Sequence, residues 1–382
     1  MKRFSISLLI LCACFVPVAW GQQPAGKCSN SWAEFHRYNM QRWNRCEKVL
    51  NVKNVGNLGL KWSYATSGYV TSSPAVANGV VYVGSDESDN NYVYALNAST
   101  GAVLWTYTND GVAGSSAAVA NGVVYVGSDD GNLYALNALT GALLWSYATG
   151  GSQVWSSPAV ANGVVYVGSY DGNVYALNAS TGALLWTYTT GFIVRSSPAV
   201  ANGVVYVGSW DGSVYALKAN TGAKLWSYTT GGQVDSSPAV ANGVVYVGSD
   251  DHNVYALDAK TGALLWSYTT RYEIYASPAV ANGVVYVGSG VGHTAKLYAL
   301  NASTGALLWS YATGSRAESS PAVANGVVYF GAYDILYALN ASTGALLWSY
   351  GLGYGESSSP AVANGVVYIG SWDGPVFAFG LK

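Results

Sequence analysis

Short apolar runs alternate with polar turns along most of the chain, and the same order of runs returns about every forty residues. One copy shows four such runs: residues 156–161 (Ser-Ser-Pro-Ala-Val-Ala), 164–168 (Val-Val-Tyr-Val-Gly), 174–177 (Val-Tyr-Ala-Leu) and 183–188 (Ala-Leu-Leu-Trp-Thr-Tyr). Their length and their β-branched and aromatic content are typical of strands. The pair Asn162-Gly163 lies between the first two runs and favours a two-residue hairpin turn. The pattern therefore predicts four short antiparallel strands per copy.

The fourth run of each copy closes on a tryptophan. These residues are Trp62, Trp105, Trp145, Trp186, Trp226, Trp266, Trp309 and Trp348, with spacings of 43, 40, 41, 40, 40, 43 and 39 residues. A regular period of this length indicates one repeated supersecondary unit, and four strands per forty residues are typical of a propeller blade. Because each repeat needs its neighbours to bury its apolar faces, we expect one all-β domain over residues 58–382.

The number of copies and the two ends of the repeat region predict how the ring closes. Eight first strands begin, at Ser72, Ser115, Ser156, Ser196, Ser236, Ala276, Ser319 and Ser358. The chain ends after a third-strand sequence, whereas residues 58–66 form a fourth-strand sequence with no strands before it. We predict an eight-bladed β-propeller of four-stranded antiparallel blades, in which strand 58–66 completes the last blade. Such closure removes an unpaired strand edge.

Differences between the repeats gather on one predicted face. The turns between first and second strands and between third and fourth strands share one face and scarcely vary. Before the first strands the residues run Thr71, Gly114, Trp155, Arg195, Asp235, Tyr275, Glu318 and Ser357; after the second strands they run Asp86, Asp129, Tyr170, Trp210, Asp250, Gly290, Tyr333 and Trp372. Aromatic and charged side chains together are what a protein partner or a small polar ligand needs.

Two alternatives stand beside this interpretation of the variable face. Exposed loops tolerate change, so the variation can be neutral. Arg195 and Asp235 occupy matching positions in adjacent blades and form either a ligand clamp or a structural salt bridge. The binding candidates are Trp155, Arg195, Asp235, Tyr275, Glu318, Tyr170, Trp210, Tyr333 and Trp372.

The first 57 residues differ from the repeats. Residues 1–21 carry Lys2 and Arg3 before an apolar run and end on a small-x-small site, which predicts a signal peptide. A membrane anchor is the alternative, but the run is short. A lipoprotein acylated at Cys14 is a third option, which the residues around Cys14 disfavour. We expect an exported chain, periplasmic or secreted, without a transmembrane segment.

Residues 22–57 are predicted to form a strap across the first and last repeats. Ser31 to Glu34 has a capping-box pattern, which predicts a short helix, and Trp32 and Trp43 would anchor the strap. Cys28 and Cys46 are the two cysteines left after signal removal. In an oxidising compartment such a pair predicts one disulfide.

Composition and charge narrow the class of partner. Charged residues make up only 9% of the chain and hydrophobic residues 51%, which excludes a disordered chain. Without residues 1–21, the chain has 15 basic and 19 acidic residues, a net charge of −4. A mildly acidic body does not favour nucleic-acid binding. No catalytic triad, paired acid site, phosphate loop or metal-ligand cluster is evident, so we expect no catalytic or metal residues.

A longer motif connects the repeats to a known family. The pattern Ala-x-Asn-x-x-Thr-Gly-x-x-x-Trp occurs at residues 95–105, 135–145, 176–186, 216–226, 256–266, 299–309 and 338–348, with Asp258 and Lys218 in place of two of the asparagines. It resembles the tryptophan-docking repeat of PQQ-type propellers. That family includes eight-bladed quinoprotein dehydrogenases and a cofactor-free lipoprotein of the outer-membrane β-barrel assembly machinery. The resemblance implies that each tryptophan packs between neighbouring blades.

Two functions are compatible with this resemblance. The first is an exported, non-catalytic and monomeric propeller that binds through its variable face and needs no cofactor. The alternative is a PQQ-dependent dehydrogenase that oxidises alcohols or sugars with PQQ and calcium. The chain lacks the adjacent cysteine pair common in such enzymes, and its loops are short. We therefore favour a binding or scaffold module.

Overall fold

The computed structural model describes residues 31–37, 40–66, 68–86, 91–109, 111, 114–290, 292–353, 355 and 358–382. The predicted signal peptide, Cys14, Cys28 and Ser357 lie outside these residues. Export, lipidation and the Cys28–Cys46 disulfide therefore remain predictions. Among the described residues, no helix has the length and apolar character to cross a membrane.

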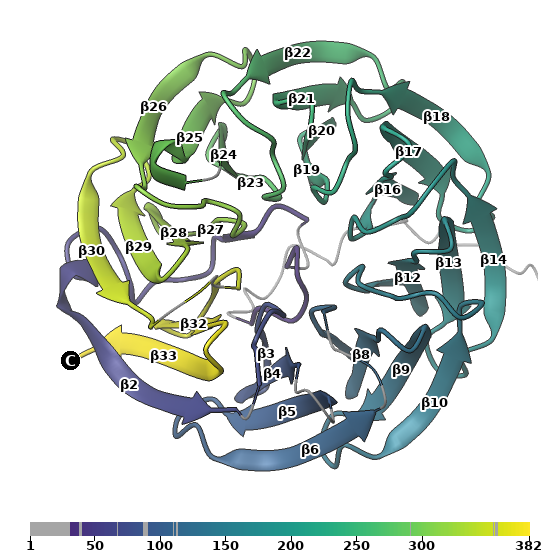
Figure 1. Cartoon of the computed structure of the whole chain (residues 1–382), viewed down its shortest axis with the longest axis horizontal. Coiled ribbons are helices and arrows are strands. Elements are labelled where there is room, and N and C mark those ends of the chain that lie inside the picture. Colours follow the sequence, from purple (N-terminus) through teal and green to yellow (C-terminus); the bar gives the residue numbers. More distant parts are fainter. Residues whose placement is uncertain are drawn as a thin grey trace, which may run out of the picture.

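Eight sheets, each with four antiparallel strands from the repeats, are arranged around a central axis, which confirms the predicted eight-bladed β-propeller (Figure 1). One of the sheets gains a fifth strand from the N-terminal strap. The innermost strands are β3 (Ala75–Ala77), β7 (Ala118–Ala120), β11 (Ala159–Ala161), β15 (Ala199–Ala201), β19 (Ala239–Ala241), β23 (Ala279–Ala281), β27 (Ala322–Ala324) and β31 (Ala361–Ala363). The second strands are β4 (Val80–Ser85), β8 (Val123–Gly127), β12 (Val164–Gly168), β16 (Val204–Gly208), β20 (Val244–Gly248), β24 (Val284–Ser289), β28 (Val327–Ala332) and β32 (Val366–Gly370).

The two outer positions of each blade are filled in the same regular way. The third strands are β5 (Asn91–Asn97), β9 (Asn132–Asn137), β13 (Asn173–Asn178), β17 (Ser213–Lys218), β21 (Asn253–Asp258), β25 (Lys296–Asn301), β29 (Ile335–Asn340) and β33 (Pro375–Leu381). The outermost strands are β6 (Val103–Asn109), β10 (Leu143–Ala148), β14 (Leu184–Thr189), β18 (Lys224–Thr229), β22 (Leu264–Thr269), β26 (Leu307–Ala312), β30 (Leu346–Gly351) and β2 (Leu58–Ala65). We number the blades 1 to 8 by their innermost strands, from β3 to β31.

Blade 8 is built from both ends of the propeller, as the sequence predicts. Strand β2 pairs antiparallel with β33, from Leu58 opposite Leu381 to Ala65 opposite Pro375. The sheet order is β2-β33-β32-β31, so the N-terminal strand supplies the outermost position. The ring is thereby closed by backbone hydrogen bonds between segments more than 300 residues apart in the sequence.

The hairpins between first and second strands have the geometry that Asn-Gly favours. Asn162 and Gly163 have φ values of 51° and 76°, and the other Asn-Gly pairs repeat these values closely. Positive φ at both central positions defines a type I′ turn, which matches the twist of the flanking strands. The pair therefore fixes the register of the two innermost strands of each blade.

Apolar cores lie between neighbouring blades. One cluster joins Tyr166, Val174 and Trp186 of blade 3 to Val205 and Leu217 of blade 4. Because each cluster draws on at least two blades, a single blade cannot bury its apolar side chains alone, which is the stability pattern of repeat proteins.

The repeat tryptophans connect consecutive blades. The Trp186 indole N–H donates to the Ala219 carbonyl oxygen at 2.9 Å, and the ring lies on Gly222, where an added Cβ would come within 2.6 Å of it. Indole N–H groups of Trp62, Trp105, Trp145, Trp186, Trp226, Trp266 and Trp309 donate to the carbonyl oxygens of Ala98, Ala138, Ala179, Ala219, Ala259, Ala302 and Ala341 at 2.9–3.1 Å. Truncating a buried side chain of this size to alanine costs about 3–5 kcal/mol.

The junction between blades 7 and 8 departs from this arrangement. Blade 8 takes its outer strand from the N-terminus, so it has no turn of the Asn-Ala-Ser-Thr-Gly kind to receive Trp348. The ring of Trp348 instead packs on Phe379 at a centroid distance of 5.2 Å. The 3₁₀ helix η1 (Val55–Asn57) precedes β2 and contacts β30 at this seam.

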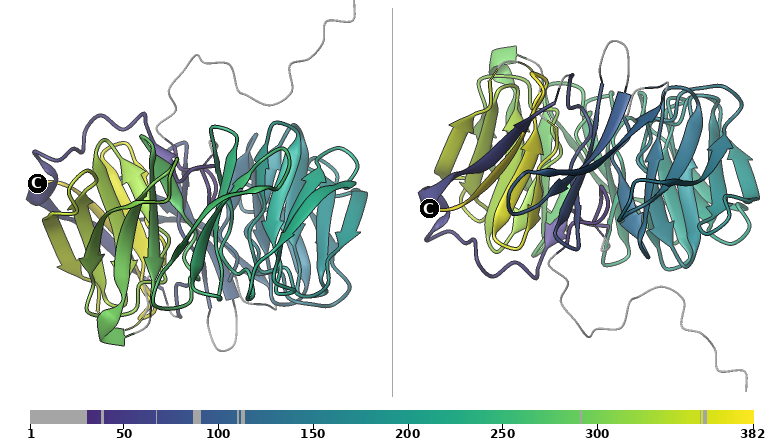
Figure 2. Two further views of the ribbon diagram at one scale, coloured as in Figure 1. Left: turned by 90° about the horizontal axis from the view of Figure 1, so that it is seen from above. Right: turned by 90° about the horizontal axis from the view of Figure 1, so that it is seen from below.

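The N-terminal strap follows a different path from the one we predicted. No helix forms at Ser31 to Glu34; Trp32 makes an isolated antiparallel bridge with Val76, and turns follow over residues 35–37. The purple strap crosses the centre of the ring (Figure 1) and lies along one of its faces when the ring is seen edge-on (Figure 2). It therefore reaches far more blades than the first and last.

The strap pairs with the innermost strands because their inner edges have no neighbouring strand. The backbone N–H groups of Val76, Val119, Val240, Val280 and Val323 donate to the carbonyl oxygens of Trp32, Ala33, Met40, Gln41 and Arg42 at 2.6–3.0 Å. Strand β1 (Trp43–Asn44) continues this pairing parallel to β27. The strap thus supplies hydrogen-bond partners to backbone N–H groups of the innermost strands, which no strand of the repeats pairs with.

The buried guanidinium of Arg42 fixes the strap at the axis. It donates to the carbonyl oxygens of Ser320, Pro321 and Pro360, from blades 7 and 8, at 2.9–3.2 Å. It also lies over the ring of Phe35 at 4.5 Å from the centroid. Burial lowers the pKa of Arg42 to about 9, and the cation is balanced by these carbonyl dipoles.

Candidate binding site at the channel mouth

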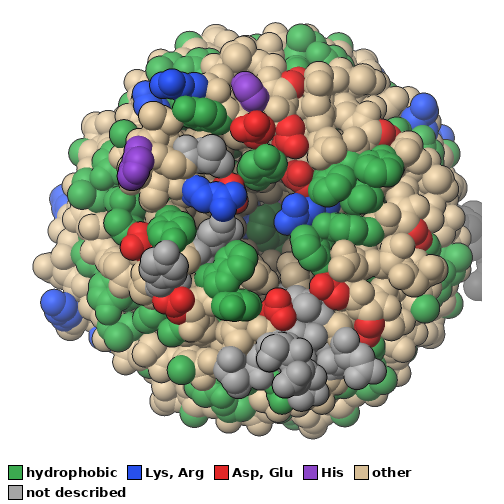
Figure 3. Space-filling view, viewed as in Figure 1, with side chains coloured by type: hydrophobic (Ala, Val, Ile, Leu, Met, Phe, Trp, Pro, Cys, Tyr) green, Lys and Arg blue, Asp and Glu red, His purple; other side chains and the backbone are tan. Residues whose placement is uncertain are grey.

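A pocket of about 780 Å³ occupies the central channel on the face that carries the variable connections (Figure 3). The first variable series supplies Thr71, Gly114, Trp155, Arg195, Asp235, Tyr275 and Glu318 to its lining, and the second supplies Asp86, Asp129, Trp210, Asp250, Tyr333 and Trp372. Phe35 of the strap also lines it, and hydrophobic atoms lie at the bottom of the hollow in Figure 3. The strap therefore floors the channel, and the opposite face forms its mouth.

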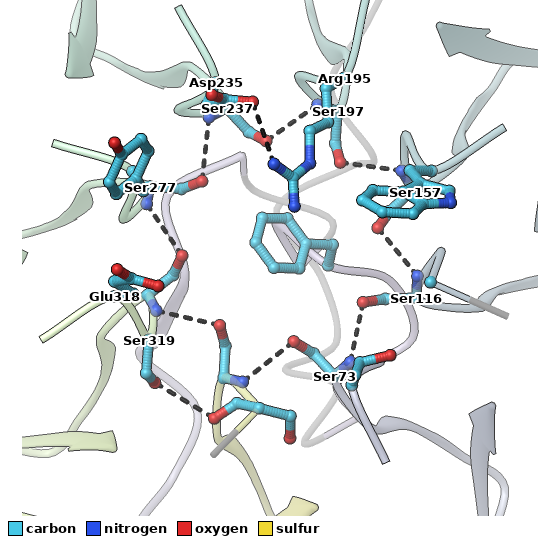
Figure 4. A pocket seen from close by; sticks show the side chains of 18 of the residues that line it. Ser73, Ser116, Ser157, Arg195, Ser197, Asp235, Ser237, Ser277, Glu318 and Ser319 are labelled. Carbon is cyan, nitrogen blue, oxygen red and sulfur yellow. Dashed lines mark hydrogen bonds and ion pairs between the residues drawn. The ribbon is translucent and has the colours of Figure 1, made fainter. Parts of the chain in front are cut away.

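A ring of eight serines surrounds the channel below the mouth (Figure 4). Each serine backbone N–H donates to the hydroxyl oxygen of the next blade's serine at 2.8–3.1 Å, in the order Ser73, Ser116, Ser157, Ser197, Ser237, Ser277, Ser320, Ser359 and back to Ser73. The bond from Ser359 to Ser73 closes the circle across the seam. Comparison of the repeats missed these residues because the serine does not vary, although the Ser-Pro pair, present in seven of the eight copies, was their signal.

Aromatic side chains form a row along one side of the mouth. Tyr170 lies between Trp155 and Trp210, with ring centroids 5.2 and 6.0 Å away, and Phe192 lies 6.3 Å from Trp210. Tyr170 is a predicted binding residue that does not line the pocket; it supports its two tryptophan neighbours. Across the mouth, Tyr69 and Trp372 are 5.4 Å apart. Phe192 and Tyr69 were not predicted, because neither belongs to the two compared series.

Arg195 is held by two partners from neighbouring blades. Its guanidinium carbon lies 4.8 Å from the Trp155 ring centroid, and Nη1 lies 3.6 Å from Oδ1 of Asp235 (Figure 4). The same Asp235 oxygen accepts the Trp210 indole N–H at 2.8 Å. The predicted pair is therefore an ion pair within the protein. The Arg195 side chain remains 43% exposed, so it stays accessible from the mouth.

Acidic side chains outnumber basic ones around the pocket. Its lining contains the carboxylates Asp86, Asp129, Asp235, Asp250 and Glu318, and the guanidinium groups of Arg195 and Arg316. Glu318 Oε1 accepts from Arg316 Nη2 at 2.8 Å and from Arg316 Nε at 3.0 Å. Each guanidinium in the lining thus already has a carboxylate partner.

Asp250 is the carboxylate of the lining whose pKa is raised most clearly. Its Oδ1 atom is buried and has no hydrogen-bond partner among the described residues. Burial, followed by the negative charges of Asp235, Glu273 and Asp251, raises the pKa of Asp250 to about 7. Burial also raises the pKa of Asp235, against the opposing effects of Arg195 and Trp210.

The donor groups at the mouth do not fit the calcium and quinone site that the alternative function requires. Within the part of the chain that the structure describes, no three His, Cys, Asp or Glu side chains are grouped so as to hold a metal ion. Asp171 and Asp211 are engaged in their own turns, where they accept from Asn173 and Ser213 backbone N–H groups at 2.9 and 2.8 Å.

Fold and pocket together define an eight-bladed propeller with a central polar and aromatic pocket. The family model described as outer membrane protein assembly factor BamB matches residues 59–113, 89–210, 191–276 and 272–382. The chain belongs to this family, which confirms the resemblance of its repeats. No curated protein matches the chain.

Solved structures share the fold at low sequence identity. BamB from Moraxella catarrhalis is 22% identical with a TM-score of 0.72, over 85% of this chain and 99% of that one. A europium-containing methanol dehydrogenase is 17% identical with a TM-score of 0.77, over 92% and 98%. Quinohemoprotein alcohol dehydrogenase from Comamonas testosteroni is 19% identical with a TM-score of 0.78, over 92% and 81%. At these identities the likeness concerns the fold alone.

Proposed function

We propose that this protein is a non-catalytic binding or scaffold module, exported to the periplasm or secreted, that captures a partner at the channel mouth. The observation that carries this proposal is the convergence of the two variable residue series on one pocket. The blades are otherwise nearly identical, so the differences between them are concentrated where a ligand would be contacted. The family's description as an outer membrane protein assembly factor agrees with a role in binding other proteins.

The chemistry of the mouth supports a protein or polar ligand. Trp155, Trp210 and Trp372 offer large apolar surfaces next to charged groups, and tryptophan, tyrosine and arginine dominate the binding energy of protein interfaces. The opposite face carries constant Asn-Gly turns, and part of it is covered by the strap. A partner that distinguishes one blade from another must therefore approach from the mouth.

Site-specific photo-crosslinking tests the proposal. A photoreactive amino acid is placed at Trp210, in the mouth, and for comparison at Ser180, an exposed residue of a constant turn. Adducts are collected from cells that export the chain. We expect adducts from position 210 and not from position 180. Equal adduct formation at both positions, or none at position 210, would contradict the proposal.

A triple substitution complements the crosslinking. Replacing Trp155, Trp210 and Trp372 with alanine removes much of the aromatic surface of the mouth, yet none of the three belongs to the tryptophans that join the blades. Partner capture is expected to be lost, while the melting temperature changes by only a few degrees. Retained capture by a folded triple variant would place the binding surface elsewhere.

The alternative function, a PQQ-dependent dehydrogenase, is tested by an activity assay. Purified protein is mixed with PQQ and calcium, and dye-linked oxidation of alcohols and sugars is recorded. Tight PQQ binding with substrate-dependent dye reduction would assign the pocket to catalysis. We expect neither, because three of the five carboxylates in the lining, Asp129, Asp235 and Glu318, are already paired with Arg195, Arg316 and the two indole N–H groups.

A further inference from the structure

We propose that the channel mouth binds the guanidinium or ammonium group of a basic polypeptide segment, at a subsite formed by Tyr275 and Asp250. This inference rests on the proposed binding function and names the chemistry of its ligand. It follows from a comparison of equivalent positions at neighbouring blade junctions, together with the charge and shape of the pocket.

Three junctions at the mouth pair an aromatic side chain with an acid. Each pair combines the residue before one first strand with the residue after the preceding blade's second strand. Between blades 2 and 3 the Trp155 indole N–H donates to Asp129, and between blades 4 and 5 the Trp210 indole N–H donates to Asp235. Between blades 5 and 6 the corresponding residues are Tyr275 and Asp250.

The third pair is not satisfied within the protein. Oδ1 of Asp250 is buried without a hydrogen-bond partner among the described residues, whereas the equivalent oxygens of Asp129 and Asp235 accept an indole N–H. A buried carboxylate oxygen without a donor is costly. A ligand that brings a donor to this oxygen therefore gains more here than at the other two junctions.

The surrounding charges select a cationic donor. Burial raises the pKa of the Tyr275 phenol, and the negative charges of Asp250, Glu273, Glu318 and Asp235 raise it further, so all four carboxylates lie near this ring. Arg195 and Arg316, the two cations in the lining, are already paired with Asp235 and Glu318. An anionic ligand would be repelled by this group of carboxylates, and a neutral donor would leave their mutual repulsion in place.

Arg195 shows how the mouth accommodates such a cation. Its guanidinium lies over the Trp155 ring and against the Asp235 carboxylate, which combines a cation–π contact with an ion pair. Tyr275 and Asp250 offer the same combination of ring and carboxylate. Tyr275 is 38% exposed and lines the pocket, so its ring is open to a ligand from the mouth.

The depth of the pocket favours a polypeptide over a small free cation. A volume of about 780 Å³ exceeds what one side chain fills. Below the mouth, the serine ring uses its hydroxyl oxygens as acceptors, so each hydroxyl keeps a proton that can be donated to a peptide carbonyl. A basic segment would place its cation at Asp250 and its backbone toward the serines.

The test compares two peptides that differ in one group, a guanidinium or the uncharged urea that replaces it in citrulline. Acetyl-Gly-Arg-Gly-amide and its citrulline analogue are titrated into the full mature chain at low ionic strength and pH 8, and binding is followed by calorimetry. We expect the arginine peptide to bind at least tenfold more tightly. Acetyl-arginine-amide is the third ligand; binding as tight as that of the peptide would overturn the polypeptide part of the inference.

Matched variants locate the subsite. Asp250→Asn is expected to remove the preference for arginine over citrulline, and Tyr275→Leu to weaken it more than Tyr275→Phe. Asp258→Asn makes the same charge change at the end of β21, next to a turn of the opposite face, and is expected to leave binding unchanged. Equal binding of the two peptides, or an undiminished preference in a folded Asp250→Asn variant, would overturn the inference. Crosslinking at position 210 would still succeed in that case, so failure here is distinguishable from failure of the proposed function.

Discussion

A tyrosine in the second strand of each blade reaches toward the turn of a neighbouring blade, and the blade that lacks this turn leaves one tyrosine hydroxyl without a partner. The Tyr286 hydroxyl donates to the Ala341 carbonyl oxygen at 3.0 Å, and this oxygen also accepts the Trp309 indole N–H. The equivalent tyrosine of the next blade is Tyr329, which is fully buried and whose hydroxyl has no partner among the described residues. Burial raises the pKa of Tyr329, so its hydroxyl stays protonated and carries an unused donor.

Removing this hydroxyl is expected to stabilise the protein. Tyr329→Phe deletes a buried polar group that has no partner, so the free energy of unfolding should rise by about 1 kcal/mol. Tyr286→Phe is the matched control, and it should lower the free energy of unfolding by about 1 kcal/mol because it leaves the Ala341 carbonyl with one donor fewer. Urea unfolding of both variants measures the difference. Equal destabilisation in the two variants would show that Tyr329 has a partner after all.

At the scale of elements, the strap carries a charged group whose protonation depends on burial. Glu34 is 8% exposed, and its carboxylate accepts the Val160 backbone N–H at 3.3 Å. Burial raises the pKa of Glu34 from 4.5 to about 7, although the hydrogen bond opposes the shift. The folded protein therefore keeps this proton at pH values where the unfolded chain has lost it.

The sign of the resulting pH dependence follows from this shift. A raised folded-state pKa gives stability that is complete below pH 4.5 and is lost as the pH rises through 7. Glu34→Gln removes this titration, so the variant should equal the parent near pH 4.5 and exceed it by roughly 3 kcal/mol at pH 8. Denaturant unfolding at both pH values measures this difference.

His36 does not disturb the comparison. Burial and the charge of Arg42 lower the pKa of His36 to about 3, and this titration is shared by parent and variant. Hydrogen bonds from Thr261 lower the pKa of Asp258, so this carboxylate is largely ionised at both pH values. Asp258→Asn is therefore the control, and its difference from the parent should not change with pH. A difference between Glu34→Gln and the parent that does not change with pH would contradict the role assigned to burial.

Strand β2 is the element on which closure of the ring depends. Deleting residues 58–66 exposes the outer edge of β33 and removes Trp62 from its contact with Ala98. We expect a lower melting temperature and aggregation in size-exclusion chromatography, because an unpaired edge recruits other chains. Addition of a synthetic peptide of residues 58–66 should restore a monomeric species. An unchanged melting temperature in the deleted protein would contradict closure by this strand.

The repeats made the blades predictable, because each strand, turn and docking tryptophan recurs with nearly the same amino-acid sequence. The strap was predictable only in part. Trp32 and Trp43 indicated that it packs on the ring, but its partners are backbone N–H groups of identical valines, and nothing in the sequence specifies which blade each residue meets. The short helix was wrong because Trp32 gains a β-bridge with Val76 that a helix would forfeit.

The candidate site, too, could be predicted only in part. Positions such as Trp155 and Asp235 were found because they differ between copies, and both line the pocket. The serine ring and Phe35 were missed, the first because it never varies and the second because it comes from outside the repeats. Comparison of repeats detects what differs between blades and is insensitive to what all blades contribute together.

At the scale of the whole molecule, the number of blades is fixed by contacts that span the ring. Deleting residues 158–197 removes one complete repeat and joins Ser157 to Pro198, so every local junction can still form. The serine ring would have seven members, and the strap would meet the wrong blades. We expect this variant to lose cooperative thermal unfolding, followed by circular dichroism.

A second variant of equal length separates blade number from blade identity. Replacing residues 158–197 with a copy of residues 198–237 keeps eight blades and is expected to unfold like the parent. Because the exchange also removes Tyr170 and Arg195, folding is the only property compared. A seven-bladed variant that melts cooperatively at the parent's temperature would show that the serine ring and the strap do not set the count.

The path of the strap has a consequence for how such a protein can change over time. Nearly identical repeats are easily duplicated or lost when the coding sequence recombines, and every docking tryptophan would find an equivalent partner in a larger or smaller ring. The strap would not, because Glu34 contacts blade 3 while Met40, Gln41 and Arg42 contact blades 5, 6 and 7 in turn. A segment outside the repeats thus matches the circumference of an eight-bladed ring, and a ring with any other number of blades would lose its hydrogen bonds to the strap.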